Sequence, residues 1–328
     1  MKVLVTGGAG YIGDSAVEYL LNRGDHVTVL DNLMYGHSYM RHHNNLTFVR
    51  GDITEQHLTN KLVYDNDAVL HLAAIVGDGA CAANPERTIE VNQDATLGIA
   101  NACFNYKKRM VFASTCSVYG ANNNLIDEDS PTNPLSLYAG TKLKAEAYVR
   151  QVPEHYIFRL GTLFGLSTEH ARLRCDLVAN ILTYKACLGE KLTVFGGDQY
   201  RPLLHVRDAG ELMGLACSTV PFDATSRPPN AYGMYILSDR NCTILKLAET
   251  ILSVCDLPRT QLEVTEIAFE DQRNYKVSDK RRGKFWLTRF PLIVGIREIQ
   301  KIVEEGRIAN VWDVQHHNAR YTKEVLND

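Results

Sequence analysis

Residues 2–13 read Lys2-Val3-Leu4-Val5-Thr6-Gly7-Gly8-Ala9-Gly10-Tyr11-Ile12-Gly13. The apolar residues predict a short buried β-strand, and the glycines follow it directly in the spacing Gly-x-x-Gly-x-x-Gly. The first glycine permits a tight turn, the second lets backbone approach a diphosphate, and the third lets a helix pack on the strand. The apolar face of residues 14–23 predicts that helix, whose free N–H groups would point at the phosphates. This stretch therefore predicts a dinucleotide site at the start of a parallel sheet.

The same alternation of strand and helix continues over the first half of the chain. Strand-like stretches recur at 26–30, 46–50, 68–76, 110–114 and 156–164, with helical patterns at 86–106 and 137–151. This rhythm predicts an α/β fold with a doubly wound parallel Rossmann sheet over residues 1–165. The irregular remainder, 166–328, is expected to form a smaller C-terminal substrate-binding lobe. Segments near 192–220 and 234–240 are expected to return to the first domain, and the polar tail from about residue 310 to pack weakly.

Composition excludes several classes of protein. The chain is 45% hydrophobic and 22% charged with a net charge of −3, which is typical of a globular protein and unlike a nucleic-acid-binding one. It lacks a run of about 18 apolar residues, so no membrane span is expected, and the short apolar start predicts no signal peptide. Eight cysteines without a Cys-x-x-Cys pair indicate reduced thiols in a cytoplasmic protein and no metal site.

Two carboxylates follow predicted strands where a dinucleotide would lie. Asp31 ends the second strand, where a carboxylate accepts hydrogen bonds from a ribose diol. It would repel a 2′-phosphate, and its neighbours Asn32 and Leu33 carry no positive charge, so NAD is favoured over NADP. A solvated aspartate at a strand end is the alternative. Asp52 and Ile53 follow the third strand and are expected near the adenine, although Gly-Asp is also an ordinary turn sequence.

Tyr138 and Lys142 stand one helical turn apart in the predicted helix 137–151, so both point to one side. A free tyrosine has a pKa of about 10, and a nearby ammonium lowers it. Tyr138 would then remove a proton from a hydroxyl group while hydride leaves the same carbon. Thr115, at the end of the strand 110–114, would hydrogen-bond the same oxygen. A surface Tyr–Lys pair is the alternative reading of this common spacing.

Five stretches carry a family resemblance: residues 6–13, His71-Leu72-Ala73-Ala74, 114–120 (STCSVYG), Tyr138-Ala139-Gly140-Thr141-Lys142 and 201–208 (RPLLHVRD). They resemble the motifs of the extended short-chain dehydrogenase/reductase family, in particular its NAD-dependent nucleotide-sugar epimerases and dehydratases. The resemblance implies a catalytic triad of Thr115, Tyr138 and Lys142, and a structural asparagine at Asn92. It also implies a homodimer that pairs the helices near 86–106 and 137–151.

The motifs and the resemblance together give one expected set of cofactor-binding residues. For NAD these are Gly7, Gly10, Tyr11, Ile12, Gly13, Asp31, Asn32, Asp52, Ile53, Leu72, Ala73, Ala74, Asn92, Tyr138 and Lys142.

The residues after Thr115 bear on the reaction. Dehydratases of this family carry an Asp-Glu pair that eliminates water, where this chain has Cys116 and Ser117. Related decarboxylases also tend to carry a glutamate at the Ser117 position, and the 3,5-epimerising members a cysteine there. The resemblance therefore argues against dehydration. It implies that Cys116 packs in the core, with a catalytic part left open.

Oxidation of a sugar hydroxyl at C4 to a ketone remains. A nucleotide-sugar epimerase is expected, with a 4-dehydrogenase or ketoreductase as the alternative, and a non-catalytic NAD(H)-sensing relative as a remote one. Thr162 replaces the usual family asparagine and, with Asn180, resembles a branch that includes heptose 4-dehydrogenases.

The expected substrate is a nucleotide-diphosphate sugar. Its expected contacts are Thr115, Thr162, Asn180, Arg201 and Arg273, of which the two arginines would bind the diphosphate. Arg172 and Arg174 either reach the substrate or belong to a solvated loop.

Overall fold

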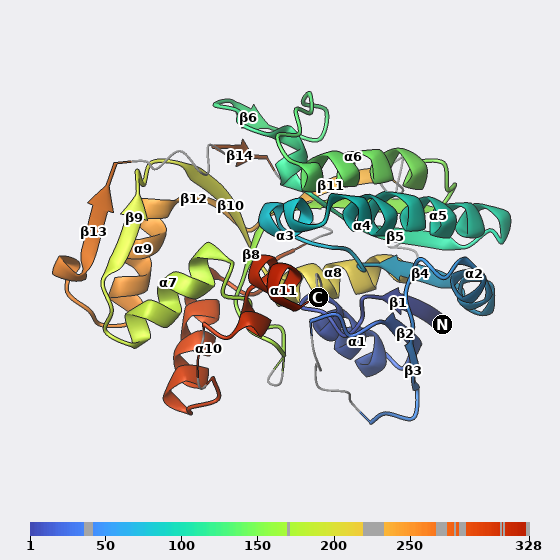
Figure 1. The fold of residues 1–328 in the computed structure, drawn as a ribbon, viewed down its shortest axis with the longest axis horizontal. Helices are drawn as coiled ribbons and strands as arrows, with labels where there is room; N and C mark the ends of the chain where they lie inside the picture. The colour runs from blue at the N-terminus through green and yellow to red at the C-terminus, as the bar shows by residue number, and fades with distance from the viewer. Residues whose placement is uncertain are drawn as a thin grey trace.

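The structure is a computed structural model. It describes residues 1–35, 42–168, 171–218, 233–266, 274–278, 280–281, 287–308, 310 and 312–325. A large α/β part and a smaller outer part lie side by side (Figure 1). Arg273 lies outside the described residues.

The large part is built on a seven-stranded sheet with the order β11-β7-β5-β4-β1-β2-β3. Its strands are β1 Lys2–Thr6, β2 His26–Asp31, β3 Leu46–Arg50, β4 Ala68–His71, β5 Arg109–Thr115, β7 His155–Leu160 and β11 Gly233–Leu237. Every neighbouring pair is parallel, and the chain returns from β3 at one edge of the sheet to β4 beside β1, where the strand order reverses. The predicted doubly wound parallel sheet is therefore confirmed.

Helices cover both faces of this sheet. One face carries α1 Gly13–Asn22 and α8 Val206–Cys217; the other carries α2 Gln56–Asp65, α5 Ala95–Asn105 and α6 Leu137–Val149. The alternation of side chains along β1 explains the two layers, because Val3 and Val5 pack with the first pair of helices and Leu4 with the second group. A continuous apolar strand such as β1 is thus buried on both sides.

The outer part holds short sheets and three amphipathic helices around its own apolar core. Its elements are β8 Thr162–Phe164, α7 Val178–Cys187, β9 Leu192–Phe195, β10 Tyr200–His205, β12 Arg240–Thr243, α9 Ile244–Val254, β13 Leu262–Thr265 and α10 Leu292–Glu304. Strand β10 pairs with β8 and β12, and β9 pairs with β13. The segment near 192–220, which was expected to return to the first domain, is divided between the two parts. Strands β9 and β10 lie in the outer sheets, whereas α8 packs on α1 of the large part. Strand β11 extends the large sheet beside β7.

Several smaller elements connect these two parts or lie beside them. Helix α3 Asp78–Ala83 follows β4, helix α4 Pro85–Ile89 leads toward α5, and a two-stranded pair joins β6 Leu125–Ile126 to β14 Lys276–Val277. The C-terminal helix α11 Asn318–Val325 packs against α3 (Figure 1). The expectation of a weakly packed tail is wrong here, because the polar side chains of this segment are used in hydrogen bonds across the cleft.

Candidate active site

The carboxyl ends of the central parallel strands open into one cavity of about 840 Å³, and the outer part forms its opposite wall. The cavity brings together most of the residues that the sequence predicted for the site. These are Gly7, Gly10, Tyr11, Ile12, Gly13, Asp31, Asn32, Asp52, Ile53, Leu72, Ala73, Ala74, Thr115, Tyr138, Lys142, Thr162 and Arg201.

The glycine turn after β1 has no room for side chains. Gly7 has φ +71°, and a Cβ there would come within 2.7 Å of the backbone nitrogen of Ala73. A Cβ on Gly13 would overlap the carbonyl oxygen of Gly7, and Gly10 donates its N–H to that same oxygen at 3.0 Å. The bare backbone forms a cradle at the start of α1, which fits the diphosphate of a dinucleotide.

Asp31 is held in place at the end of β2. Its Oδ2 accepts the N–H of Ala9 at 3.0 Å and its Oδ1 accepts that of Leu33 at 2.8 Å. Burial raises the pKa of this carboxyl, and the two hydrogen bonds act in the opposite direction. The carboxylate is thus tied to the glycine turn on one side and to the loop after β2 on the other. This placement fits recognition of a ribose diol.

Asp52 lies in a polar network that the sequence did not predict in full. Its Oδ2 accepts hydrogen bonds from Asn32 Nδ2 at 2.8 Å and from Arg87 Nη2 at 2.6 Å. Burial opposes the charged form, but hydrogen bonds from Thr54 and Asn32 and the charge of Arg87 lower the pKa of Asp52. Arg87 comes from α4 and also lines the cavity. Arg87 reaches Asp52 because α4 lies beside the loop after β3, and no local pattern in the sequence indicates that contact.

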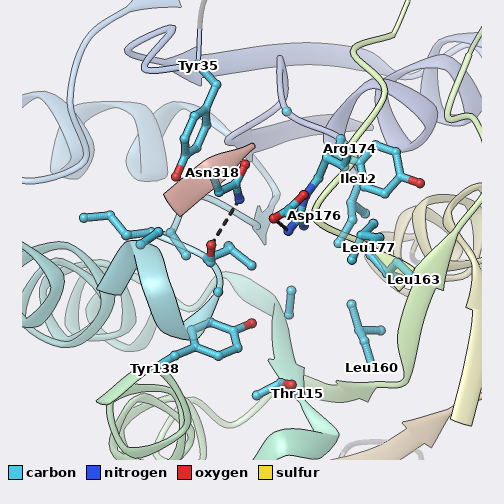
Figure 2. A pocket seen from close by; sticks show the side chains of 18 of the residues that line it. Ile12, Tyr35, Thr115, Tyr138, Leu160, Leu163, Arg174, Asp176, Leu177 and Asn318 are labelled. Carbon is cyan, nitrogen blue, oxygen red and sulfur yellow. Dashed lines mark hydrogen bonds and ion pairs between the residues drawn. The ribbon is translucent and has the colours of Figure 1, made fainter. Parts of the chain in front are cut away.

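Tyr138 and Thr115 face one another inside the cavity (Figure 2). Ser136 caps α6 by accepting the N–H of Ala139 at 3.2 Å, which places Tyr138 in the first helical turn. Thr115 lies at the end of β5. Burial raises the pKa of Tyr138, whereas the charge of Arg174 and the hydroxyl group of Thr115 act to lower it.

Lys142 lies one helical turn further along α6 and is almost completely buried. Its Nζ donates to the carbonyl oxygen of Ala113 at 2.9 Å and lies 4.7 Å from the centre of the Phe112 ring. Burial lowers the pKa of Lys142 to about 8. Tyr138 and Lys142 both line the cavity.

Asp78 is a cavity residue that sequence reasoning missed. It begins α3, and its Oδ1 accepts the hydroxyl of Ser136 at 2.7 Å. Its charge contributes to the raised pKa of Tyr138. The sequence contains an indication of this place, because Asp78 follows the apolar stretch 68–76 after one glycine, much as Asp31 ends the second strand.

Cys116 and Ser117 follow Thr115 but have different surroundings. The Cys116 side chain is fully buried, its thiol donates to the carbonyl oxygen of Arg159 at 3.4 Å, and burial raises its pKa. Ser117 lines the cavity, and among the described lining residues Cys116 is absent. A neutral thiol in this position packs against Val118 and Tyr119.

Two predicted asparagines lie behind the cavity wall. Asn92 accepts the N–H of Ile75 at 2.8 Å and donates to its carbonyl at 2.9 Å, which fixes the loop after β4. Asn180 is fully buried; it accepts the N–H of Gly165 and donates to the carbonyl oxygen of Arg174, both at 2.9 Å. The structure thus gives both side chains backbone partners.

Arg201 and Thr162 lie on adjacent strands of the outer sheet and both line the cavity. The Arg201 guanidinium is largely buried and donates to the carbonyl oxygen of Tyr200 at 2.9 Å. A cation in this wall suits an anionic substrate. Among the described residues, no group of His, Cys, Asp and Glu side chains is arranged to hold a metal ion. Each described helix is too short or too polar to span a bilayer.

Comparisons with known proteins agree with this geometry. A model of the NAD-dependent epimerase/dehydratase family matches residues 3–230. A UDP-glucose 4-epimerase of Halalkalibacterium halodurans is 31% identical over 69% of this chain and 73% of its own. A dTDP-glucose 4,6-dehydratase of Mycolicibacterium smegmatis is 33% identical over 63% of this chain and 66% of its own. The structure of Thermus thermophilus UDP-glucose 4-epimerase with NAD matches with a TM-score of 0.74 and 25% identity, over 92% of this chain and 98% of that one.

Proposed function

Since the chain belongs to the NAD-dependent epimerase/dehydratase family, we propose that it is a nucleotide-sugar epimerase that acts through a 4-keto intermediate. The observation that carries the proposal is the placement of Tyr138 opposite Thr115 in the same cavity as the glycine turn (Figure 2). NAD is the family's cofactor, and the cradle around Gly7 and the carboxylate of Asp31 fit its diphosphate and ribose.

The proposed roles of the side chains follow from their places. Tyr138 takes the proton of the sugar hydroxyl at C4, and Thr115 holds the same oxygen through a hydrogen bond. NAD held by the glycine turn and Asp31 would supply the hydride acceptor for C4 and the hydride donor for the opposite face of the ketone. Tyr138 then gives its proton back to the oxygen at C4. Lys142, one turn further along α6, provides the positive charge that stabilises a phenolate on Tyr138.

Dehydration is disfavoured because Cys116 and Ser117 follow Thr115 at the positions where the family's dehydratases carry a pair of carboxylates. Cys116 is turned into the core against Arg159, and Ser117 presents an uncharged hydroxyl. The carboxylate that does lie near Tyr138 is Asp78, and it accepts the hydroxyl of Ser136 at the start of α6. We therefore assign Asp78 to positioning α6.

A 4-dehydrogenase or ketoreductase on the same fold is the second candidate. Thr162 favours it, since this residue stands in the cavity where epimerases of the family usually carry an asparagine. We propose that residues 166–328 mainly supply the substrate wall and that the protein is cytoplasmic. All eight cysteines are free, which suits a reducing compartment.

A panel of nucleotide sugars incubated with NAD in deuterated water tests the proposal. We expect a C4 epimer with no net NADH and no deuterium on carbon, because the hydride returns to the carbon it left. Stoichiometric NADH in place of an epimer would overturn the epimerase in favour of the dehydrogenase. Deuterium on carbon would show enolisation and would overturn the role of Tyr138 as the main proton-transfer group.

A further inference from the structure

Two arginines lie in the cavity wall on the segment between β8 and α7. Arg174 uses Nε and Nη2 to bind both carboxylate oxygens of Asp176, at 3.1 and 2.6 Å. Arg172 donates to uncharged oxygens, namely the carbonyl of Gln315 at 2.6 Å and Oδ1 of Asn318 at 2.8 Å. The two guanidinium groups thus differ in the charge of their partners.

Among the residues that the structure describes, the pair carries more positive charge than the carboxylates bonded to it cancel. Both carboxylate oxygens of Asp176 are bonded to Arg174. The charge of Asp176 acts to raise the pKa of Arg174 and also that of Arg172. Burial and the charge of Arg174 lower the pKa of Arg172 to about 10, so Arg172 keeps its proton at neutral pH. The aromatic ring of Tyr35, 4.6 Å away, and the neighbouring His316, whose pKa burial lowers, add no full negative charge. A partly buried cation such as Arg172 is stabilised by an anion.

The two arginines lie beside the two segments expected to hold the cofactor, namely the glycine turn and the loop after Asp31. The Arg174 guanidinium lies 5.8 Å from the ring centre of Tyr11, inside the glycine turn. Tyr35, which stacks under Arg172, follows Asp31 by one short loop. Figure 2 shows Arg174 next to Ile12 at one end of the pocket, with Tyr138 and Thr115 at the other. The excess charge therefore faces the cofactor end of the cavity.

Helix α11 holds this wall together. Asn318 accepts from Arg172 and donates to the carbonyl oxygen of Val76, in the loop after β4, at 3.1 Å (Figure 2). The side chain of Ala319 lies so near Gly79 that a Cβ on that glycine would approach it to 2.9 Å. Tyr321 meets Tyr35 edge to face at 5.3 Å. The C-terminal helix thus connects Arg172 to both loops that border the cofactor site.

We propose that Arg172 and Arg174 bind the diphosphate of the dinucleotide cofactor from the side opposite the glycine turn, with Asn318 of α11 positioning Arg172. Guanidinium groups bind phosphate oxygens through charge-assisted hydrogen bonds, which the glycine turn supplements with backbone N–H groups. The proposal concerns the cofactor end of the cavity and is independent of the sugar reaction. Because a nucleotide sugar also contains a diphosphate, the test separates the two ligands.

Calorimetric titration of the full chain, stripped of cofactor, tests the proposal with four ligands: NAD, ADP, adenosine and UDP. For Arg172→Gln and Arg174→Gln, we expect the affinities for NAD and ADP to fall by about tenfold or more, the scale of one lost charge-assisted bond. Adenosine, which has no phosphate, keeps its affinity, and UDP measured with saturating NAD does too. The matched control is Arg297→Gln, an exposed arginine of α10, for which all four affinities stay unchanged.

Three results would overturn the proposal. Unchanged NAD and ADP binding would mean that the charge faces elsewhere. An equal loss of adenosine affinity would mean that the variant damages the pocket, and a loss for UDP alone would assign the arginines to the substrate. Arg172→Lys and Asn318→Ala, which disturb packing less, keep the test decisive if Arg172→Gln unfolds. Both are expected to weaken ADP binding and to leave adenosine binding intact.

Discussion

At the scale of single residues, Tyr138 carries the proposed proton transfer. Tyr138→Phe removes the phenolic oxygen and keeps the ring, so we expect turnover to fall by about 10² or more while NAD affinity is unchanged. Steady-state rates and calorimetric NAD titration measure the two quantities. Tyr148→Phe, on the same helix, is the control and is expected to keep wild-type turnover. Tyr138→Phe with wild-type turnover would contradict the assigned role.

Lys142 makes the reaction sensitive to pH. Burial lowers the pKa of Lys142 to about 8, so its ammonium form is present below that pH and is lost as the pH rises through it. If this charge supports the Tyr138 phenolate, kcat/KM falls above about pH 8. Lys142→Met lowers kcat/KM below about pH 8 and removes this alkaline limb. A wild-type profile that keeps rising above pH 9 would contradict the role of the ammonium.

The residue scale also shows what spacing leaves undetermined. The interval between Tyr138 and Lys142 predicted that both lie on one side of α6, and both line the cavity. It did not predict that Lys142 would bond to Ala113, or that the charge of Arg174 would act on the pKa of Tyr138. Those interactions depend on β5 and on the outer part, which no local pattern places.

At the scale of elements, the glycine turn and α1 form one unit. A side chain in Gly13→Ala would overlap the carbonyl oxygen of Gly7, so we expect NAD affinity to fall by about tenfold or more as the turn opens. Gly140→Ala is the matched control, since a Cβ there meets nothing within 4 Å. It should raise the free energy of unfolding by about 0.5–1 kcal/mol through helix propensity and leave NAD binding intact. Equal NAD affinity in both variants would contradict the cradle.

Helix α11 is the element that sequence reasoning judged least well. Its apolar pattern is weak, and its described buried residues are polar, Asn318 and Thr322. The hydrogen bonds of Asn318 to Arg172 and Val76 anchor it to two distant segments. Hydrophobic periodicity identifies a helix that has an apolar face, and it does not identify a helix that packs through polar groups.

At the scale of the whole molecule, we propose a homodimer formed through α5 and α6, as the family resemblance implied. The two helices pack side by side on one face of the sheet, and Phe104 near the end of α5 is 55% exposed. Light scattering on the purified protein should give about twice the chain mass of 36.8 kDa. Ala147→Arg, on the exposed side of α6, should give monomers because it adds a large charged side chain to the proposed interface.

The control for the dimer is Arg297→Glu, which changes charge on α10 in the outer part and should remain dimeric. A wild-type protein that scatters as a monomer at micromolar concentration would contradict the proposal. A dimer that survives Ala147→Arg would place the interface elsewhere.

The sequence by itself determined the parallel sheet, the glycine cradle and the places of Asp31 and Tyr138. Each follows from residues that are neighbours in the chain, and local periodicity and turn chemistry act over such short spans. Only the tertiary structure joined Asp78 to Ser136, turned Asn180 into the core, and brought α11 across the cleft to Arg172. These contacts link polar groups far apart in the chain, and they form only after the buried sheet has fixed where each loop emerges.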